Sequence, residues 1–167
     1  MKKIIFILST SIVVLSSCQK FQEPGQTSAV QVANEWWVTL DSVGIQDYYG
    51  IGHQRILTYN TAANDNNIWV DDNKQTYGFK IKALVDYSNL TFSTAQAGAA
   101  NEYFVSGSTS FPETAIITDG KIFPKAAHSK AGNVVDSIHM KIEFSDSPGF
   151  IYEINGVARS KFPQDDY

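Results

Sequence analysis

The side chains that could perform hydrolytic chemistry are few and widely separated in this sequence. The histidines are His53, His128 and His139, and their separations match no metal-ligand spacing. No Gly-x-Ser-x-Gly sequence is present to place a nucleophilic serine on a sharp turn. His139 alternates with charged residues in a strand-like run, so we expect it to face solvent. The sequence indicates no catalytic residue, no metal site and no cofactor.

Oxygen-bearing side chains gather in residues 64–67 and 71–73, which are rich in Asp and Asn. A calcium site would need several of these oxygens to converge, and the EF-hand order with its central glycine is not matched. Asp and Asn are also the residues that turns use. We therefore predict turns at both places.

The most specific chemical signal is the only cysteine. Lys2 and Lys3 precede an apolar stretch over residues 4–15, which is too short for a permanent transmembrane helix. The following Leu15-Ser16-Ser17-Cys18 resembles the bacterial lipobox, in which the thiol receives a thioether-linked diacylglycerol. We predict a signal peptide over residues 1–17, lipidation at Cys18, a lipidated polar tether over residues 18–28 and a folded domain over residues 29–167.

Two acyl chains on Cys18 would anchor the protein stably to a membrane. Residue 19 is Gln instead of the Asp that signals inner-membrane retention, so we expect the outer membrane, on either face. Removal of Lys2 and Lys3 changes the formal charge from −4 to −6, and the rest of the chain holds no basic block. Nucleic acid is therefore excluded as a partner.

Period-two patterns dominate residues 29–167, and no helical period persists beyond two turns. We predict about eight to ten short strands in a single antiparallel up-and-down β-barrel, in preference to a sandwich. The predicted strands cover residues 35–40, 55–61, 68–70, 76–87, 91–93, 103–106, 116–118, 121–123, 135–144, 150–154 and 157–162.

Two dipeptides predict tight hairpins, Asp119-Gly120 and Asn155-Gly156. A two-residue turn at Asn155-Gly156 would pair Tyr152 with Arg159 and point Arg159 into the barrel. A charge there needs a partner, and Trp36 on the inward face of the first strand is suitable. We predict that Arg159 lies within about 6 Å of the Trp36 ring and seals one end.

Trp36 and Arg159 resemble the calycin signature, which is a G-x-W on the first strand and a basic residue on the last. In this sequence the first part is Asn34-Glu35-Trp36, so Asn34 stands where the signature has glycine. A longer resemblance is to the Bacteroides-type lipoproteins called lipid-binding putative hydrolases, whose G-x-R-R-T-G-F ending is present only in part, as Gly156 to Phe162. The resemblance implies a calycin-like, lipocalin-like barrel and lipid binding. The segments that carry it include Glu35-Trp36-Trp37-Val38, Thr58-Tyr59-Asn60-Thr61-Ala62, Ile68-Trp69-Val70-Asp71-Asp72, Phe79-Lys80-Ile81-Lys82, Leu90-Thr91-Phe92-Ser93, Asp119-Gly120-Lys121-Ile122, Asp136-Ser137-Ile138 and Ile142-Glu143-Phe144-Ser145-Asp146.

Inward-facing side chains of the predicted strands are the candidates for a ligand cavity. Such residues either pack a small barrel completely or line a space for an apolar molecule. Asp136 at the start of its strand either orients a ligand or caps the strand. The candidate cavity residues are Tyr77, Phe79, Ile81, Val85, Asp136, Ile138, Met140, Ile142, Phe144 and Tyr152.

Three functions follow. The first is an anchored barrel that binds a lipid or another apolar small molecule. The second, carried by the family resemblance alone, is an esterase-like hydrolase. The third is an accessory envelope protein that binds a partner protein or a glycan-uptake complex through exposed Trp37 and Trp69.

Overall fold

The computed structural model describes residues 26–167, and the predicted signal peptide and Cys18 lie outside this range. Within it, no helix is long and apolar enough to cross a membrane. One 3₁₀ turn follows the last strand, at Pro163–Asp165. The strands are β1 (Asn34–Ser42), β2 (Gln54–Asn60), β3 (Asn67–Asp71), β4 (Lys80–Asp86), β5 (Thr91–Ser93), β6 (Ala99–Ala100), β7 (Thr114–His128), β8 (Val134–Phe144) and β9 (Ile151–Ala158).

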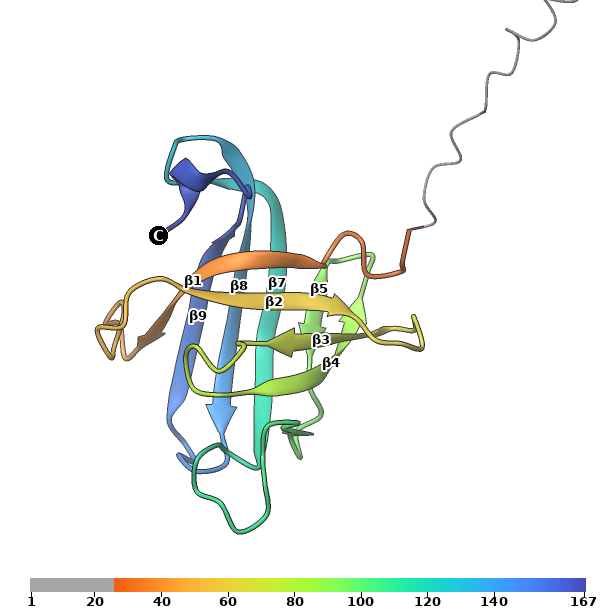
Figure 1. Cartoon of the computed structure of the whole chain (residues 1–167). Helices are drawn as coiled ribbons and strands as arrows, with labels where there is room; N and C mark the ends of the chain where they lie inside the picture. Colours follow the sequence, from red (N-terminus) through yellow and green to blue (C-terminus); the bar gives the residue numbers. More distant parts are fainter. Residues whose placement is uncertain (1–25) are drawn as a thin grey trace, which may run out of the picture.

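The strands form one antiparallel sheet that closes on itself (Figure 1). The order runs β5-β4-β3-β2-β1-β9-β8-β7-β6, and an additional pairing of β5 with β7 completes the circle. Eight strands make the barrel, and the two-residue β6 pairs with the first residues of β7. The predicted antiparallel up-and-down barrel is confirmed.

Alternation along each strand sends one set of side chains into the barrel, as the sequence pattern predicts. On β1 the inward residues are Trp36, Val38 and Leu40, all at most 1% exposed. On β4 they are Ile81, Ala83 and Val85, and on β8 they run from Ile138 to Phe144 at every second position. The aliphatic and aromatic side chains from all eight strands meet in one core.

Both predicted hairpin turns are wrong, because each dipeptide lies inside a continuous strand. Asp119-Gly120 interrupts the register of β7 against β8 as a bulge, with Asp119 at φ 54°. Asn155-Gly156 lies within β9, which pairs with β1 on one side and β8 on the other. The predicted strand over residues 103–106 is also absent, and the predicted strand over 76–87 begins only at Lys80.

Each of these glycines is required by a close approach of another chain segment. A Cβ at Gly120 would lie 2.3 Å from the carbonyl oxygen of Phe92, where short β5 meets β7. A Cβ at Gly156 would lie 2.4 Å from the carbonyl oxygen of Trp37. Glycine therefore lets the strands approach each other at these points. The dipeptide alone does not show whether its glycine serves a turn or a close approach of strands.

The predicted contact between Arg159 and Trp36 is wrong for the same reason. Without the turn, the inward residues of β9 are Tyr152, Ile154, Gly156 and Ala158, so Arg159 points outward. Its guanidinium carbon lies 5.9 Å from the ring centroid of Trp37 instead. It donates hydrogen bonds to Glu35 (2.8 Å) and, in bidentate fashion, to Asp166 (both 2.7 Å).

Arg159 thus ties the C-terminal residues 159–167 to the outer wall. The neighbouring Asp165 is buried, and hydrogen bonds from Ser160 and further donors lower the pKa of its carboxyl to about 2. Asp165 also accepts hydrogen bonds from Ala131 and Asn133 of the β7–β8 turn. The C-terminal residues therefore hold the end of the barrel where β9 finishes.

Trp36 does lie inside the barrel, and its polar partner is Thr58 of β2. The indole N–H donates to the Thr58 hydroxyl at 2.9 Å, and that hydroxyl donates to the carbonyl of Val32. Ala29 and Val32, in the turn before β1, are buried against the same core. The turn over residues 28–33 therefore plugs this end of the barrel, which we call the closed end.

We predict that Thr58→Val lowers the free energy of unfolding by about 2–4 kcal/mol, because it strands a buried indole N–H and a buried carbonyl. Thr58→Ser keeps the hydroxyl and loses one methyl group, so we expect about 1 kcal/mol. Urea denaturation of the two variants beside the parent measures both. Equal stability of the two variants would contradict the assigned role of the hydroxyl.

Candidate functional site

The end of the barrel opposite the closed end is formed by four segments that are distant in sequence. They are the β1–β2 loop (43–53), the β3–β4 loop (72–79), the long segment between β5 and β7 (94–113) and the β8–β9 loop (145–150). We call this end the mouth. Loops on a rigid barrel are where binding residues concentrate, and barrel mouths are common ligand sites.

A pocket of about 460 Å³ opens at the mouth. All four segments contribute to it, and its size lies in the range typical of small-molecule sites. The lining residues are Tyr49, Ile51, Thr76, Tyr77, Ser110 and Asp146.

Asp72 builds the part of the mouth that carries Thr76 and Tyr77. Its side chain is fully buried, and its two carboxylate oxygens accept six hydrogen bonds from residues 74–79. Five donors are backbone N–H groups and the sixth is the Thr76 hydroxyl. The buried charge is compensated by these donors, which also fix the loop conformation.

Aromatic rings form the floor beneath the pocket. The Tyr77 ring stacks on Phe144 with centroids 4.0 Å apart, and Phe144 packs against Phe79 and Tyr152. The hydroxyls of Tyr49 and Tyr152 lie 2.6 Å apart and share a hydrogen bond. Burial, followed by the hydrogen bond to Tyr49, raises the pKa of Tyr152, so the phenol stays protonated at physiological pH.

Polar groups stand on the rim above this floor. The Tyr77 hydroxyl lies 2.9 Å from the Ser147 hydroxyl and donates to the Asp146 carboxylate at 3.2 Å. Ile51 is 38% exposed and Tyr49 is 51% exposed, so the apolar side of the rim is open to solvent. The pocket therefore offers an aromatic and aliphatic surface next to hydroxyl groups and one carboxylate.

Most of the cavity residues expected from the sequence lie deeper than this pocket. Phe79, Ile81, Ile138, Met140, Ile142, Phe144 and Tyr152 are at most 2% exposed, so their side chains leave no water-sized space beside them. Of the ten candidates, Tyr77 lines the mouth pocket and Val85 lines a second pocket on the wall. A ligand role for the ten residues stays a prediction.

Asp136 caps a strand irregularity outside the core. Its Oδ1 accepts a hydrogen bond from the backbone N–H of Lys125 at 2.7 Å. Lys125 has φ 53° and lies where the register of β7 against β8 shifts. Of the two roles expected for Asp136, capping describes this hydrogen bond.

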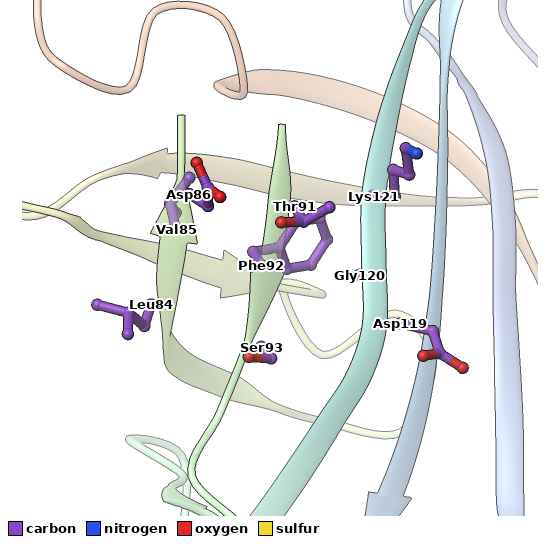
Figure 2. A pocket seen from close by; sticks show the side chains of 9 residues that line it. All are labelled: Leu84, Val85, Asp86, Thr91, Phe92, Ser93, Asp119, Gly120 and Lys121. Atoms are coloured by element: carbon purple, nitrogen blue, oxygen red, sulfur yellow. The ribbon is translucent and has the colours of Figure 1, made fainter. Parts of the chain in front are cut away.

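The second pocket, of about 530 Å³, is a groove on the outer wall where β5 lies between β4 and β7 (Figure 2). We call it the wall groove. Its exposed lining mixes Leu84, which is 61% exposed, with Asp86, Asp119 and Lys121. Phe92 lies beside Gly120 at the bottom, consistent with the close approach of β5 to β7. A third pocket lies against Trp69 and Lys82 on the outer wall.

The three imidazoles lie on separate elements and line none of these three pockets. His53 stacks on Tyr167 with centroids 3.8 Å apart, His139 lies 2.7 Å from the Asn155 side chain on the outer wall, and exposed His128 ends β7. The sequence expectation that His139 faces outward is confirmed, since it alternates with inward Ile138 and Met140.

The expected exposure of two tryptophans is wrong, although both rings do point outward. Trp37 is half-buried under Tyr167 and Arg159. Trp69 is half-buried beneath the ammonium groups of Lys80 and Lys82, at 5.0 and 4.8 Å from its ring centroid. Both rings are covered by cations or aromatic rings of the same chain and form no open aromatic patch.

Sequence reasoning missed Tyr49, Ile51, Thr76, Ser110 and Asp146, which line the mouth. Strand periodicity identifies core positions and is silent on loops. The available signal was the pair of adjacent tyrosines followed by Gly-Ile-Gly, an apolar cluster in a segment with no strand pattern to bury it.

A closed antiparallel barrel with a tryptophan buried at the start of its first strand, a plugged end and an aromatic pocket at the other end is a calycin-like barrel. Comparison with family models places the chain more narrowly: residues 21–163 match the model described as lipid-binding putative hydrolase. The chain belongs to this family. Comparison with curated proteins gives no match.

We predict that Asp72→Asn lowers the free energy of unfolding by about 3 kcal/mol or more, because the amide cannot accept all the hydrogen bonds that converge on the carboxylate. Urea denaturation measures the loss. Asp86→Asn is the matched control, since Asp86 is an exposed carboxylate that accepts bonds from Ser88 and Asn89 of its own turn. Equal effects of the two substitutions would refute the central role of Asp72.

Proposed function

We propose that this protein binds an amphiphilic lipid at the mouth of its barrel, with the apolar part of the ligand against Tyr49, Ile51 and Tyr77. The observation that carries the proposal is the mouth pocket, because four loops converge on it and it combines an aromatic floor with a polar rim. Membership in a lipid-binding family supports the same class of ligand.

The mouth is favoured over the wall groove because of its lining. The exposed wall groove carries two carboxylates and one ammonium beside a single exposed aliphatic side chain. A hydrocarbon chain gains most from continuous apolar surface, since its transfer from water is favourable in proportion to the apolar area removed. The mouth offers two aromatic rings and an isoleucine together.

Binding is measured by isothermal titration calorimetry with monododecanoylglycerol, kept below its aggregation concentration, on the unlipidated Cys18→Ser chain. Calorimetry is chosen because all three tryptophans lie away from the mouth, at the closed end and on the outer wall. We expect saturable binding to the parent chain. Ile51→Asp is expected to weaken binding about tenfold, since a charge replaces apolar contact area.

Leu84→Asp is the matched control, because it places the same charge on an exposed aliphatic residue of the wall groove. It is expected to bind like the parent chain. Loss of binding in Leu84→Asp with retention in Ile51→Asp would move the ligand to the wall groove. Absence of binding to the parent chain would overturn the proposal.

We also propose that a diacylated Cys18 anchors the mature chain to the outer membrane. The support is the Leu-Ser-Ser-Cys sequence after an apolar stretch, and Gln instead of Asp at position 19. Two acyl chains bind a bilayer stably, whereas one binds marginally.

Replacing Cys18 by Ser is expected to abolish incorporation of radiolabelled palmitate and to move the protein from the membrane fraction to the soluble one. Sucrose-gradient separation of envelope membranes from cells that express the parent chain places the anchored form. Palmitate incorporation into the Cys18→Ser variant would contradict the assignment of the lipid to this thiol.

A further inference from the structure

Charge at the mouth is strongly one-sided. The four mouth segments contain five carboxylates, Asp47, Asp72, Glu102, Glu113 and Asp146, and only one lysine or arginine, Lys74. The single carboxylate in the lining of the pocket is Asp146, and no lysine or arginine lines it. An anionic head group would therefore meet only repulsive charge in the pocket.

The single lysine of these segments is already engaged. The Lys74 ammonium lies 4.7 Å from the ring centroid of Tyr103 and 5.3 Å from that of Phe111, and Lys74 does not line the pocket. Asp47 is engaged as well, since its carboxylate accepts the backbone N–H groups of Ile51 and Gly52. Asp72 is fully buried and saturated by its own loop.

Asp146 differs from these groups. It is exposed, and its carboxylate accepts one hydrogen bond, the 3.2 Å bond from the Tyr77 hydroxyl. The Tyr77 ring stacks on Phe144, packs against Tyr152 with centroids 5.4 Å apart, and lines the pocket beside Asp146. A carboxylate beside tyrosine rings is the arrangement that attracts an ammonium group, through charge and through the negative faces of the rings.

We infer that the mouth selects amphiphiles whose head group carries a positive charge, with Asp146 as the counter-ion and Tyr49 and Tyr77 as the ring surfaces. This inference rests on the proposed binding of an amphiphile at the mouth and adds the chemistry of its head group. The Tyr77 hydroxyl, which also shares a hydrogen bond with Ser147, donates to the Asp146 carboxylate in the lining of the pocket.

The test uses three probes with the same dodecyl chain, titrated into the unlipidated Cys18→Ser chain below their micelle concentrations. They are dodecyltrimethylammonium, monododecanoylglycerol and dodecanoate. We expect the ammonium probe to bind about tenfold tighter than the glycerol ester, and dodecanoate to bind most weakly. Asp146→Asn is expected to weaken binding of the ammonium probe about tenfold, to the level of the neutral probe measured on the same variant.

Glu113→Gln is the matched control, because Glu113 is an exposed carboxylate of a mouth segment that does not line the pocket. It is expected to leave the order of the probes unchanged. Equal or tighter binding of dodecanoate overturns the inference, as does an equal effect of Asp146→Asn and Glu113→Gln. Either result, obtained while the neutral probe binds, overturns the inference on the head group and leaves the proposed function intact. Failure of all three probes to bind would overturn the proposed function itself.

Discussion

The buried carboxylate of Asp72 is the contact on which the candidate site depends. A charge without water is tolerated only when donors surround it, and here the donors belong to five residues within 74–79. Folding around this charge fixes the loop before β4, and the loop then stacks Tyr77 on Phe144. The pocket therefore owes its shape to a buried polar interaction, although half of its lining residues are aromatic or aliphatic.

Barrel closure sets the second constraint, and it explains why the inward positions on the strands could be predicted while the turns could not. The period of two follows from the geometry of a single strand. Inward residues such as Met140 and Val38 can therefore be predicted without knowing how the strands pair. The dipeptides Asn-Gly and Asp-Gly indicate instead that the backbone at that position requires a residue without a side chain or a residue with a positive φ. In this barrel Gly156 passes beneath the Trp37 carbonyl, and Gly120 passes Phe92 where the sheet closes. Both needs arise from contacts with other strands, which the local sequence does not contain.

The same distinction separates the predictable part of the site from the rest. The sequence identified the rings beneath the pocket, Phe144 and Tyr152, because they lie on strands. Asp146 and Ser110 lie in loops, 36 residues apart in number, and meet only because β7 and β8 carry their loops to the same end of the barrel. Inward periodicity likewise distinguishes interior from exterior but not filled space from empty space. That difference depends on how side chains from eight strands interdigitate, a property of the assembled core.

In the proposed function, the closed end lies toward the anchor and the mouth holds the ligand. The chain enters at the closed end, where Ser28 bonds to Asn64 and the turn before β1 plugs the core. With the proposed anchor at Cys18, the segment up to residue 26 reaches at most about 28 Å, since an extended residue spans about 3.5 Å. The chain thus meets the closed end first, and the mouth lies at the other end of the barrel. An amphiphile with a charged head group is more soluble as a monomer than a neutral one, and would therefore reach a mouth that lies away from the proposed anchor through the aqueous phase.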